Sequence, residues 1–298
     1  MNIIQEKVSH WFIRLLNKEE KLEPSYPLSD FDRIRYEVRP GDVLLVEGQT
    51  RVSNIVRTLT QSTWSHATLY IGRLHDIENP SDRLHVASLA GCGPDTQLVI
   101  ESALGKGTLA TSLEYYSHFH LRICRPRGIS RTDAQKVISF AIRQLGKPYN
   151  VRQIFDLMRL LLPLTFIPRH WHSSLFKSED ASDVARTVCS TMLVEAFQSV
   201  NFPVLPIIEE KNNRFTLKKS NPFLAIPKDF DTSPYFEIIK YPFISFESQG
   251  RYHSLPWSTE TEDAVKVPTQ PVNQTPKTEQ PQYLDASAGV FKDNTNGQ

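Results

Sequence analysis

The sequence has few of the residues and patterns that define a disulfide framework, a metal centre or a membrane span. Its 298 residues include three cysteines, Cys92, Cys124 and Cys189, an odd number without CxxC spacing. This argues against both a disulfide scaffold and a structural zinc site. No run of about 18 apolar residues occurs, so we expect no transmembrane helix. The short histidine motifs HFH (118–120) and HWH (170–172) lack a third ligand nearby, and we expect no metal and no cofactor.

The overall charge and the missing motifs exclude further classes of protein. Lys and Arg number 34 against 33 Asp and Glu, which argues against a broad basic nucleic-acid-binding face. The LGKGT stretch around Lys106 lacks the first glycine of a phosphate-binding loop, and no GxSxG nucleophile elbow is present. The first residues lack a basic and then apolar signal peptide, so a cytoplasmic location is the default expectation.

We divide the chain into three parts by composition. Residues 1–30 comprise an amphipathic helix, with apolar residues at i, i+3, i+4 and i+7, and a linker. Residues 31–254 are expected to form one α+β domain. Residues 255–298 are rich in Thr, Gln, Pro and Asn, and we expect this tail to be disordered because it cannot bury enough apolar surface.

Within the middle part, the hydrophobic patterns predict strands and helices. Helical periodicity predicts a helix over 132–145, with Thr132 and Gln135 as a capping box, and another over 187–200. A short helix is expected over 52–62 with Ser53 as a possible cap, and 73–96 is expected to be a polar loop. Strands are expected near 43–46, 67–71, 97–102 and 120–126.

Two residues in this pattern are candidates for nucleophilic chemistry. His66 opens a buried strand, and Cys189 lies near the start of a helix, where backbone N–H groups and the helix dipole lower the pKa of a thiol. Ser190 and Thr191 are small and leave the sulfur accessible. A cysteine nucleophile needs a base and a group that orients the base. Taken singly, His66 and Cys189 are each better explained by structural roles in the core.

Glu101 is the candidate for the orienting acid. It ends a strand in which Leu98 and Ile100 share one face, and Val99 and Glu101 share the other. If this strand pairs with that of His66, the carboxylate comes within reach of the imidazole. A surface carboxylate at a strand end is the alternative. Cys92 lies in a glycine-rich loop and Cys124 within a strand, so both are weaker nucleophile candidates.

The motifs RPGDVLLVEG, TQSTWSHATLYIG, VIES, LGKPYN and TVCSTMLVEAF, in this order, resemble the YiiX/YebB-like cysteine hydrolases. These form the circularly permuted branch of the NlpC-type papain-like superfamily, in which the histidine block precedes the cysteine helix. The resemblance covers about residues 38–200 and a later closing segment, AIPKDFDTSPYF. It implies an α+β papain-like fold, with an antiparallel, partly barrel-like sheet packed against the cysteine helix.

The resemblance also implies roles for individual residues. Cys189 is the nucleophile, His66 the general base and Glu101 the acidic third member. Tyr149 matches the G-x-P-Y position, and its hydroxyl would help to bind the oxyanion. The spacing from Tyr149 to Cys189 is long for the family, and Asn150 stands where many relatives carry an acid.

The expected function is hydrolysis of an amide or ester bond through a thioester on the cysteine. We expect Trp64, Ser65 and Ser190 to contact substrate, with a buried core residue as the alternative for Trp64. The substrate is a peptide or a lipid-like amide or ester, and a peripheral membrane contact is possible. The alternatives are an acyltransferase of the same fold and a non-catalytic binding module. The apolar insertion after Tyr149 is expected to line the substrate groove or to extend the core; its apolar residues are Leu160, Leu161, Leu162, Leu164, Phe166 and Ile167.

Overall fold

The computed structural model describes residues 14, 16–18, 26–91, 93–147, 188–211, 213–245 and 255. The chain divides into a compact unit of residues 1–243 and a second unit of residues 244–298. The predictions for the tail, for most of the N-terminal helix, and for Cys92, Tyr149 and the apolar insertion lie outside the described residues. Among the described residues, no helix is both long and apolar enough to cross a bilayer.

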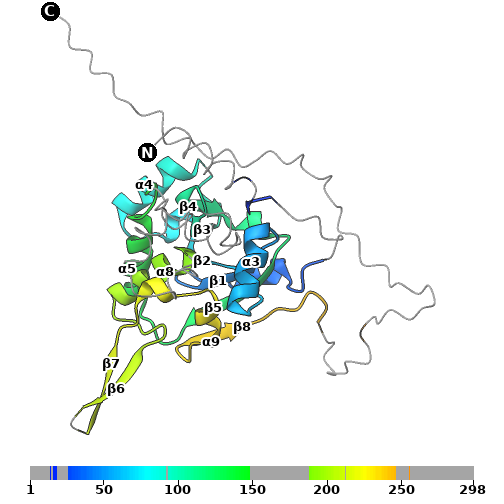
Figure 1. Cartoon of the computed structure of the whole chain (residues 1–298). Helices are drawn as coiled ribbons and strands as arrows, with labels where there is room; N and C mark the ends of the chain where they lie inside the picture. The colour runs from blue at the N-terminus through cyan, green and yellow to red at the C-terminus, as the bar shows by residue number, and fades with distance from the viewer. Residues whose placement is uncertain are drawn as a thin grey trace, which may run out of the picture. The chain divides into compact units, whose positions relative to one another are not determined.

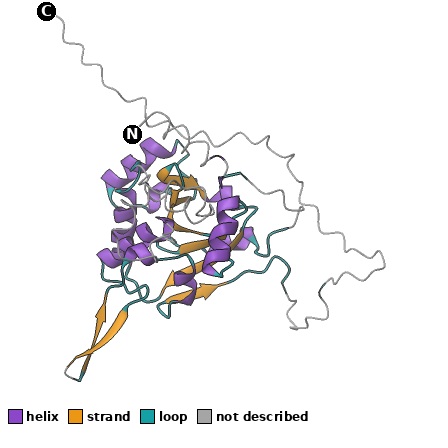
Figure 2. Cartoon of the chain, in the orientation of Figure 1, coloured by secondary structure: helices purple, strands orange, loops and turns teal. Residues whose placement is uncertain are grey.

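A six-stranded antiparallel sheet forms the centre of the first unit, with helices around it (Figures 1 and 2). The strand order is β4-β3-β2-β1-β5-β8, and a separate hairpin pairs β6 with β7. The described strands are β1 (Val43–Glu47), β2 (His66–Gly72), β3 (Leu98–Ala103), β4 (Gly107–Ser112), β5 (His120–Pro126), β6 (Ile207–Lys211), β7 (Arg214–Lys218) and β8 (Phe236–Ile239). The predicted α+β class and antiparallel sheet are confirmed.

The helices occupy the connections between strands. The α-helices are α2 (Phe31–Glu37), α3 (Arg51–Thr60), α4 (Pro80–Ala90), α5 (Arg131–Ile142), α8 (Val188–Ser199) and α9 (Lys228–Thr232). Short 3-10 turns are η1 (Leu74–Asp76), η2 (Leu113–Tyr116) and η6 (Pro222–Leu224). The two helices expected near 132–145 and 187–200 are therefore present as α5 and α8.

The two faces of the sheet carry separate cores. The larger core joins one face of β2 and β3, including Leu69 and Ile100, to α4, α5 and α8. The smaller core joins the opposite face, including Tyr70 and Val99, to α2 and η2. Alternation along each strand therefore puts His66 and Glu101 on the face of the smaller core.

Three local predictions are wrong. The expected loop 73–96 contains η1 and α4. Helix α4 forms there because Asn79 caps it by accepting hydrogen bonds from the backbone N–H groups of Ser81 and Asp82. Pro80 lies in the first turn, where its missing N–H costs nothing. Helix α3 is capped by Thr50 rather than by Ser53. The third wrong prediction is the capping box at the start of α5.

Helix α5 begins at Arg131 and is capped by Ser130, whose hydroxyl oxygen accepts a bond from the N–H of Asp133. The predicted capping box of Thr132 and Gln135 is absent because Gln135 instead faces the turn after β2. Its amide donates to the carbonyl of Asp76 and accepts from the N–H of Glu78. Gln135 thereby holds α5 against the β2–α4 connection.

Candidate active site

A histidine and a carboxylate meet at the point where β2 begins. His66 Nε2 lies 2.6 Å from Glu101 Oε2. Tyr70 of β2 pairs with Val99 of β3, and continuing this register places Thr68 opposite Glu101. Glu101 is therefore a diagonal neighbour of His66 on the same face, within reach of a long side chain. The contact expected from the strand alternation is present.

The carboxylate of Glu101 is buried and bonded on both oxygens. The residue is 7% exposed, and its Oε1 accepts a 2.8 Å hydrogen bond from the hydroxyl of Thr111 on β4. Burial raises the pKa of Glu101, but the hydrogen bond and charge of His66, together with Tyr116 and Thr111, outweigh it and bring the pKa below its usual value. Glu101 is therefore ionised at neutral pH and fixed in position.

The hydrogen bond to Glu101 decides how the imidazole can act. Because Nε2 is engaged by an ionised carboxylate, it carries a proton, and the proton-accepting role falls to Nδ1. The His66 side chain is 21% exposed, so the ring is partly accessible while its partner is buried. A carboxylate in this place also stabilises the imidazolium once it forms.

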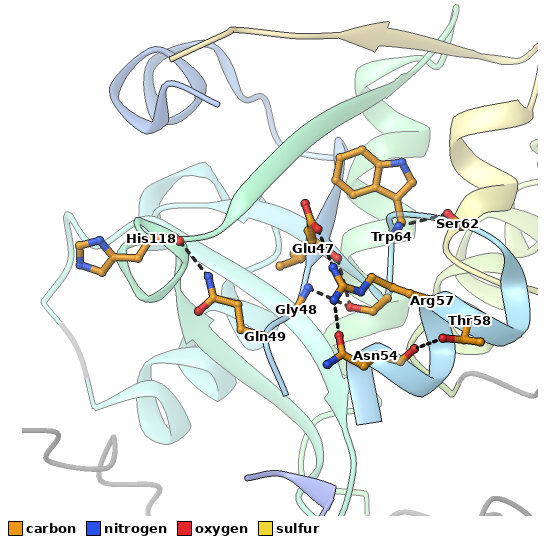
Figure 3. A network of polar contacts seen from close by, with 11 residues as sticks. Glu47, Gly48, Gln49, Asn54, Arg57, Thr58, Ser62, Trp64 and His118 are labelled. Atoms are coloured by element: carbon orange, nitrogen blue, oxygen red, sulfur yellow. Dashed lines mark hydrogen bonds and ion pairs between the residues drawn. The ribbon is translucent and has the colours of Figure 1, made fainter. Parts of the chain in front are cut away.

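The loop between β1 and α3 supports the start of β2. Ser65 is 5% exposed, and its hydroxyl oxygen accepts a 2.9 Å bond from the backbone N–H of Gly48. An added Cβ at position 48 would lie 2.2 Å from the Ser53 oxygen, so a larger residue there would displace Ser53. Arg57 of α3 pairs with Glu47 at 2.5 Å and also donates to Asn54 (Figure 3). The hydroxyl of Ser65 therefore holds the β1–α3 loop beside the start of β2.

Trp64 lies in the larger core and is 3% exposed. Its indole N–H donates to Asp231 of α9 (3.3 Å), and the Arg122 guanidinium lies 4.6 Å from its ring centroid. Arg122 also bonds to both carboxylate oxygens of Asp231, at 2.7 and 2.9 Å. His120, the last residue of the HFH motif, packs on the indole at 5.2 Å. Trp64 thus anchors α9 to the start of β2, and its expected contact with substrate stays a prediction.

The candidate nucleophile lies on α8. Cys189 is the second residue of this helix, as predicted, and Ser190 is fully buried. Helix α8 packs in the core with Leu69 of β2 and Ile100 of β3, the strands that carry the candidate base and acid. Cys124 is fully buried on β5, and burial raises the pKa of its thiol far above the usual value. Cys124 is therefore unsuited to nucleophilic attack.

The packing of α8 places its last turn on the sheet. Phe197, near its end, lies 5.3 Å from the ring of Phe236, the first residue of β8. Phe236 pairs with Pro126 at the end of β5, and the sheet register puts this end beside the end of β2. The last turn of α8 therefore lies near the end of the sheet where β2 ends.

Sequence reasoning missed the residues that support the dyad. Thr111 and Tyr116 hold Glu101, and Asp231 with Arg122 holds Trp64. Thr111 pairs with Val99 across β3 and β4, so a correct pairing of these two strands would have placed it beside Glu101. Among the described residues, no group of three His, Cys, Asp or Glu side chains is arranged to hold a metal ion.

Comparison with known proteins found one family similar to part of the chain. Residues 37–157 match the model of a family described as "Permuted papain-like amidase enzyme, YaeF/YiiX, C92 family". The match contains His66 and Glu101 and ends before Cys189. Comparison with curated protein sequences gave no match.

One similar solved structure is described as the metalloprotein yiiX from Escherichia coli O157:H7. It has 17% sequence identity and a TM-score of 0.40, over 68% of this chain and 97% of that chain. The resemblance predicted from the motifs, including the fold class, is confirmed by the family match. Residues 37–157, less than half of the chain, thus resemble a permuted papain-like amidase of the YaeF/YiiX family, and this match supports the predicted thiol hydrolase.

Proposed function

We propose that the chain cleaves an amide bond by acyl transfer to Cys189, with His66 as general base and Glu101 as the orienting acid. The observation that carries this proposal is the 2.6 Å bond between His66 Nε2 and the buried carboxylate of Glu101. A permuted papain-like amidase needs a base held in one tautomer beside a thiol at a helix start. The position of Cys189 in the first turn of α8 supports its assignment as that thiol.

The chemistry can be written with the residues in these roles. His66 Nδ1 takes the thiol proton, and Sγ of Cys189 bonds to the carbonyl carbon to form a tetrahedral oxyanion. When the intermediate collapses, the C–N bond breaks and His66 returns the proton to the leaving amine. Water, deprotonated by His66, then attacks the thioester, and the thiol leaves with its proton. Tyr149 remains the predicted oxyanion donor.

The proposed contact between the Cys189 thiol and His66 depends on where the sheet places them. Helix α8 packs on the face opposite to the dyad with its last turn near the end of β2, and we infer that its first turn lies toward the end where β2 starts. His66 is the first residue of β2, so its ring can be approached around that end. This position at a strand end, rather than mid-strand, supports the pairing of base and thiol.

The family favours a peptide-like amide as the substrate. Lipid esters or amides, transfer to an acceptor other than water, and a groove formed by the apolar insertion remain predictions. Mass spectrometry of acyl adducts trapped on Cys189 would name the acyl group, because the adduct retains it. Alkylation kinetics test the chemistry without a known substrate.

The test is limited alkylation with iodoacetamide at pH 6.5, followed by peptide mapping. We expect Cys189 to react before Cys92 and Cys124, and His66→Ala to slow its reaction at least tenfold. Cys124 serves as the internal control, because a buried thiol of raised pKa stays unmodified while the chain is folded. Faster labelling of Cys92 or Cys124, or a His66→Ala rate equal to wild type, would overturn the assignment.

A further inference from the structure

Three residues near the start of the chain, Leu16, Asn17 and Lys18, contact two parts of the domain that are far apart in sequence. The side-chain amide of Asn17 donates a 3.4 Å hydrogen bond to the backbone carbonyl of Leu104. The carbonyl of Lys18 accepts a 3.2 Å bond from the backbone N–H of Arg51. Leu16 is 4% exposed, so an apolar side chain is buried as well. We call residues 16–18 the strap.

Both attachment points of the strap lie at the end of the sheet where β2 begins. Leu104 directly follows β3, and Arg51 is the first residue of α3, which follows β1. Strand β2 lies between β3 and β1. Val46 pairs with His66, and continuing the β2–β3 register places Ala103 opposite His66. The strap is therefore bound on both sides of His66.

The strap passes over the start of β2 to make both contacts. Neighbouring strands are about 4.8 Å apart, so β1 and β3 are separated by about 10 Å. Asn17 and Lys18 are consecutive, with Cα atoms about 3.8 Å apart, so their two contacts follow the short route across β2. Because β2 occupies the space between the two anchors, the strap crosses the end of the sheet at His66.

The hydrogen bonds of the strap are of a kind that opens locally. The bond to Leu104 is longer than is usual for an N–H···O bond. Asn17 is half-buried and Lys18 is exposed, so water can replace both bonds. Segments held by solvent-exposed hydrogen bonds open at a lower free energy than the core. The strap can therefore leave the end of the sheet while the domain stays folded.

A purely structural role, as a cap of α3, is the alternative. The carbonyl of Lys18 satisfies one of the N–H groups that the first turn of a helix leaves without an intrahelical partner. However, Thr50 already caps α3 by accepting from the N–H of Ser53. A cap also does not account for the bond from Asn17 to the turn after β3, on the other side of β2.

We propose that the strap closes the entrance to His66 and that its release exposes the base. Solvent reaches the dyad through His66, because the side chain of His66 is 21% exposed and that of Glu101 is 9% exposed. A segment bound across the start of β2 restricts this approach, and its opening admits a reagent or a substrate. The consequence, a hydrolase restrained by its own N-terminal segment, rests on the function proposed above for His66.

The test is the rate at which diethyl pyrocarbonate modifies His66 in the full chain at pH 7, measured by peptide mapping. Asn17→Asp removes the donor to Leu104 at equal size, and we expect His66 to react about fivefold faster, as for the loss of one hydrogen bond. His75, whose side chain is 61% exposed, is the internal standard and should react at the wild-type rate. Asn79→Asp is the matched control, because Asp caps α4 as well as Asn does, and it should leave the His66 rate unchanged.

Exchange of the Arg51 amide hydrogen reports release of the strap separately, because this N–H bonds to Lys18. If Asn17→Asp leaves this exchange unchanged, the double variant with Leu16→Ser is measured in its place. Faster exchange at Arg51 without faster modification of His66 would overturn the proposal, as would wild-type rates in the double variant.

Equal acceleration of His75 and His66 would also overturn it, because this shows loosening of the whole domain. Diethyl pyrocarbonate reacts with an imidazole whether or not Cys189 is the nucleophile. Failure of this proposal is therefore distinguished from failure of the proposed function, which the alkylation of Cys189 tests.

Discussion

Replacing Glu101 by Gln removes a charge from the dyad while keeping its shape. The carboxylate accepts from His66 at 2.6 Å and from Thr111 at 2.8 Å. A glutamine can present its carbonyl oxygen to His66 and its amide to the Thr111 hydroxyl, which can accept. The variant therefore tests the negative charge rather than the presence of a hydrogen-bonding group.

The size of the effect follows from the ion pair that the charge stabilises. In the proposed mechanism, a thiolate of Cys189 forms together with an imidazolium of His66, and Glu101 stabilises that imidazolium. Unit charges about 4 Å apart at an effective dielectric constant of about 20 attract by about 4 kcal/mol. Solvent reaches the His66 side chain, which is 21% exposed, and weakens this attraction. Glu101→Gln should therefore destabilise the imidazolium by about 1.5–3 kcal/mol, the range for hydrogen bonds to charged groups. The reactive thiolate fraction should fall about 10- to 150-fold.

The assay is the rate of Cys189 alkylation by iodoacetamide at pH 6.5, measured by peptide mass spectrometry. Glu114→Gln is the matched control, because Glu114 is 66% exposed in η2 and its loss should leave the rate unchanged. Urea unfolding confirms that Glu101→Gln is folded. If a folded Glu101→Gln chain alkylates Cys189 within threefold of the wild-type rate, the carboxylate does not support the base and the reasoning fails.

Three further predictions concern stability. Trp64→Ala should lower the free energy of unfolding measured in urea by about 3–5 kcal/mol. Trp64→Phe should lower it much less, because Phe fills most of the space and only the bond to Asp231 is lost. Equal losses in the two variants would refute this prediction. The pKa of Glu101 is lowered on folding, so its carboxylate adds stability above its ordinary pKa of 4.5, and this stability is lost as the pH falls through the folded value. Between about pH 5 and 3, the free energy of unfolding of the wild type should therefore fall more steeply than that of Glu101→Gln. Parallel curves of unfolding free energy against pH would contradict this prediction. Removing residues 255–298 should change Tm by less than about 2 °C, because their composition predicts no core; a larger drop would show that they pack.

The strand that carries the acid was predictable, because alternation is a local property. Leu98 and Ile100 lie in the larger core and Val99 lies in the smaller one. Glu101 lies on the same face of the strand as Val99, as the alternation predicts. Helix α4 was not predictable in this way, since Val86 is buried while Leu84 and Leu89 are exposed, which leaves no clear helical stripe.

The supporting residues depend on contacts that span long distances in the chain. Asp231 lies 167 residues from Trp64, and nothing in either local sequence indicates that they meet. Thr111 and Tyr116 required the β3–β4 pairing and the turn after it. The base and acid could therefore be found from motifs, whereas the residues that fix them required the tertiary structure.

The order of strands in the sheet has a consequence for how the enzyme comes into being during synthesis. His66, Glu101, Thr111 and Tyr116 lie within 51 consecutive residues, and β1 to β4 are sequential neighbours in the sheet. Contacts of such short range form early in folding. Cys189 follows Tyr116 by 73 residues, so the ribosome has delivered the base and its acid before the thiol emerges. In the proposed mechanism, Cys189 and His66 first meet when α8 docks on the sheet, so a nascent chain would carry no reactive thiolate until its core is closed.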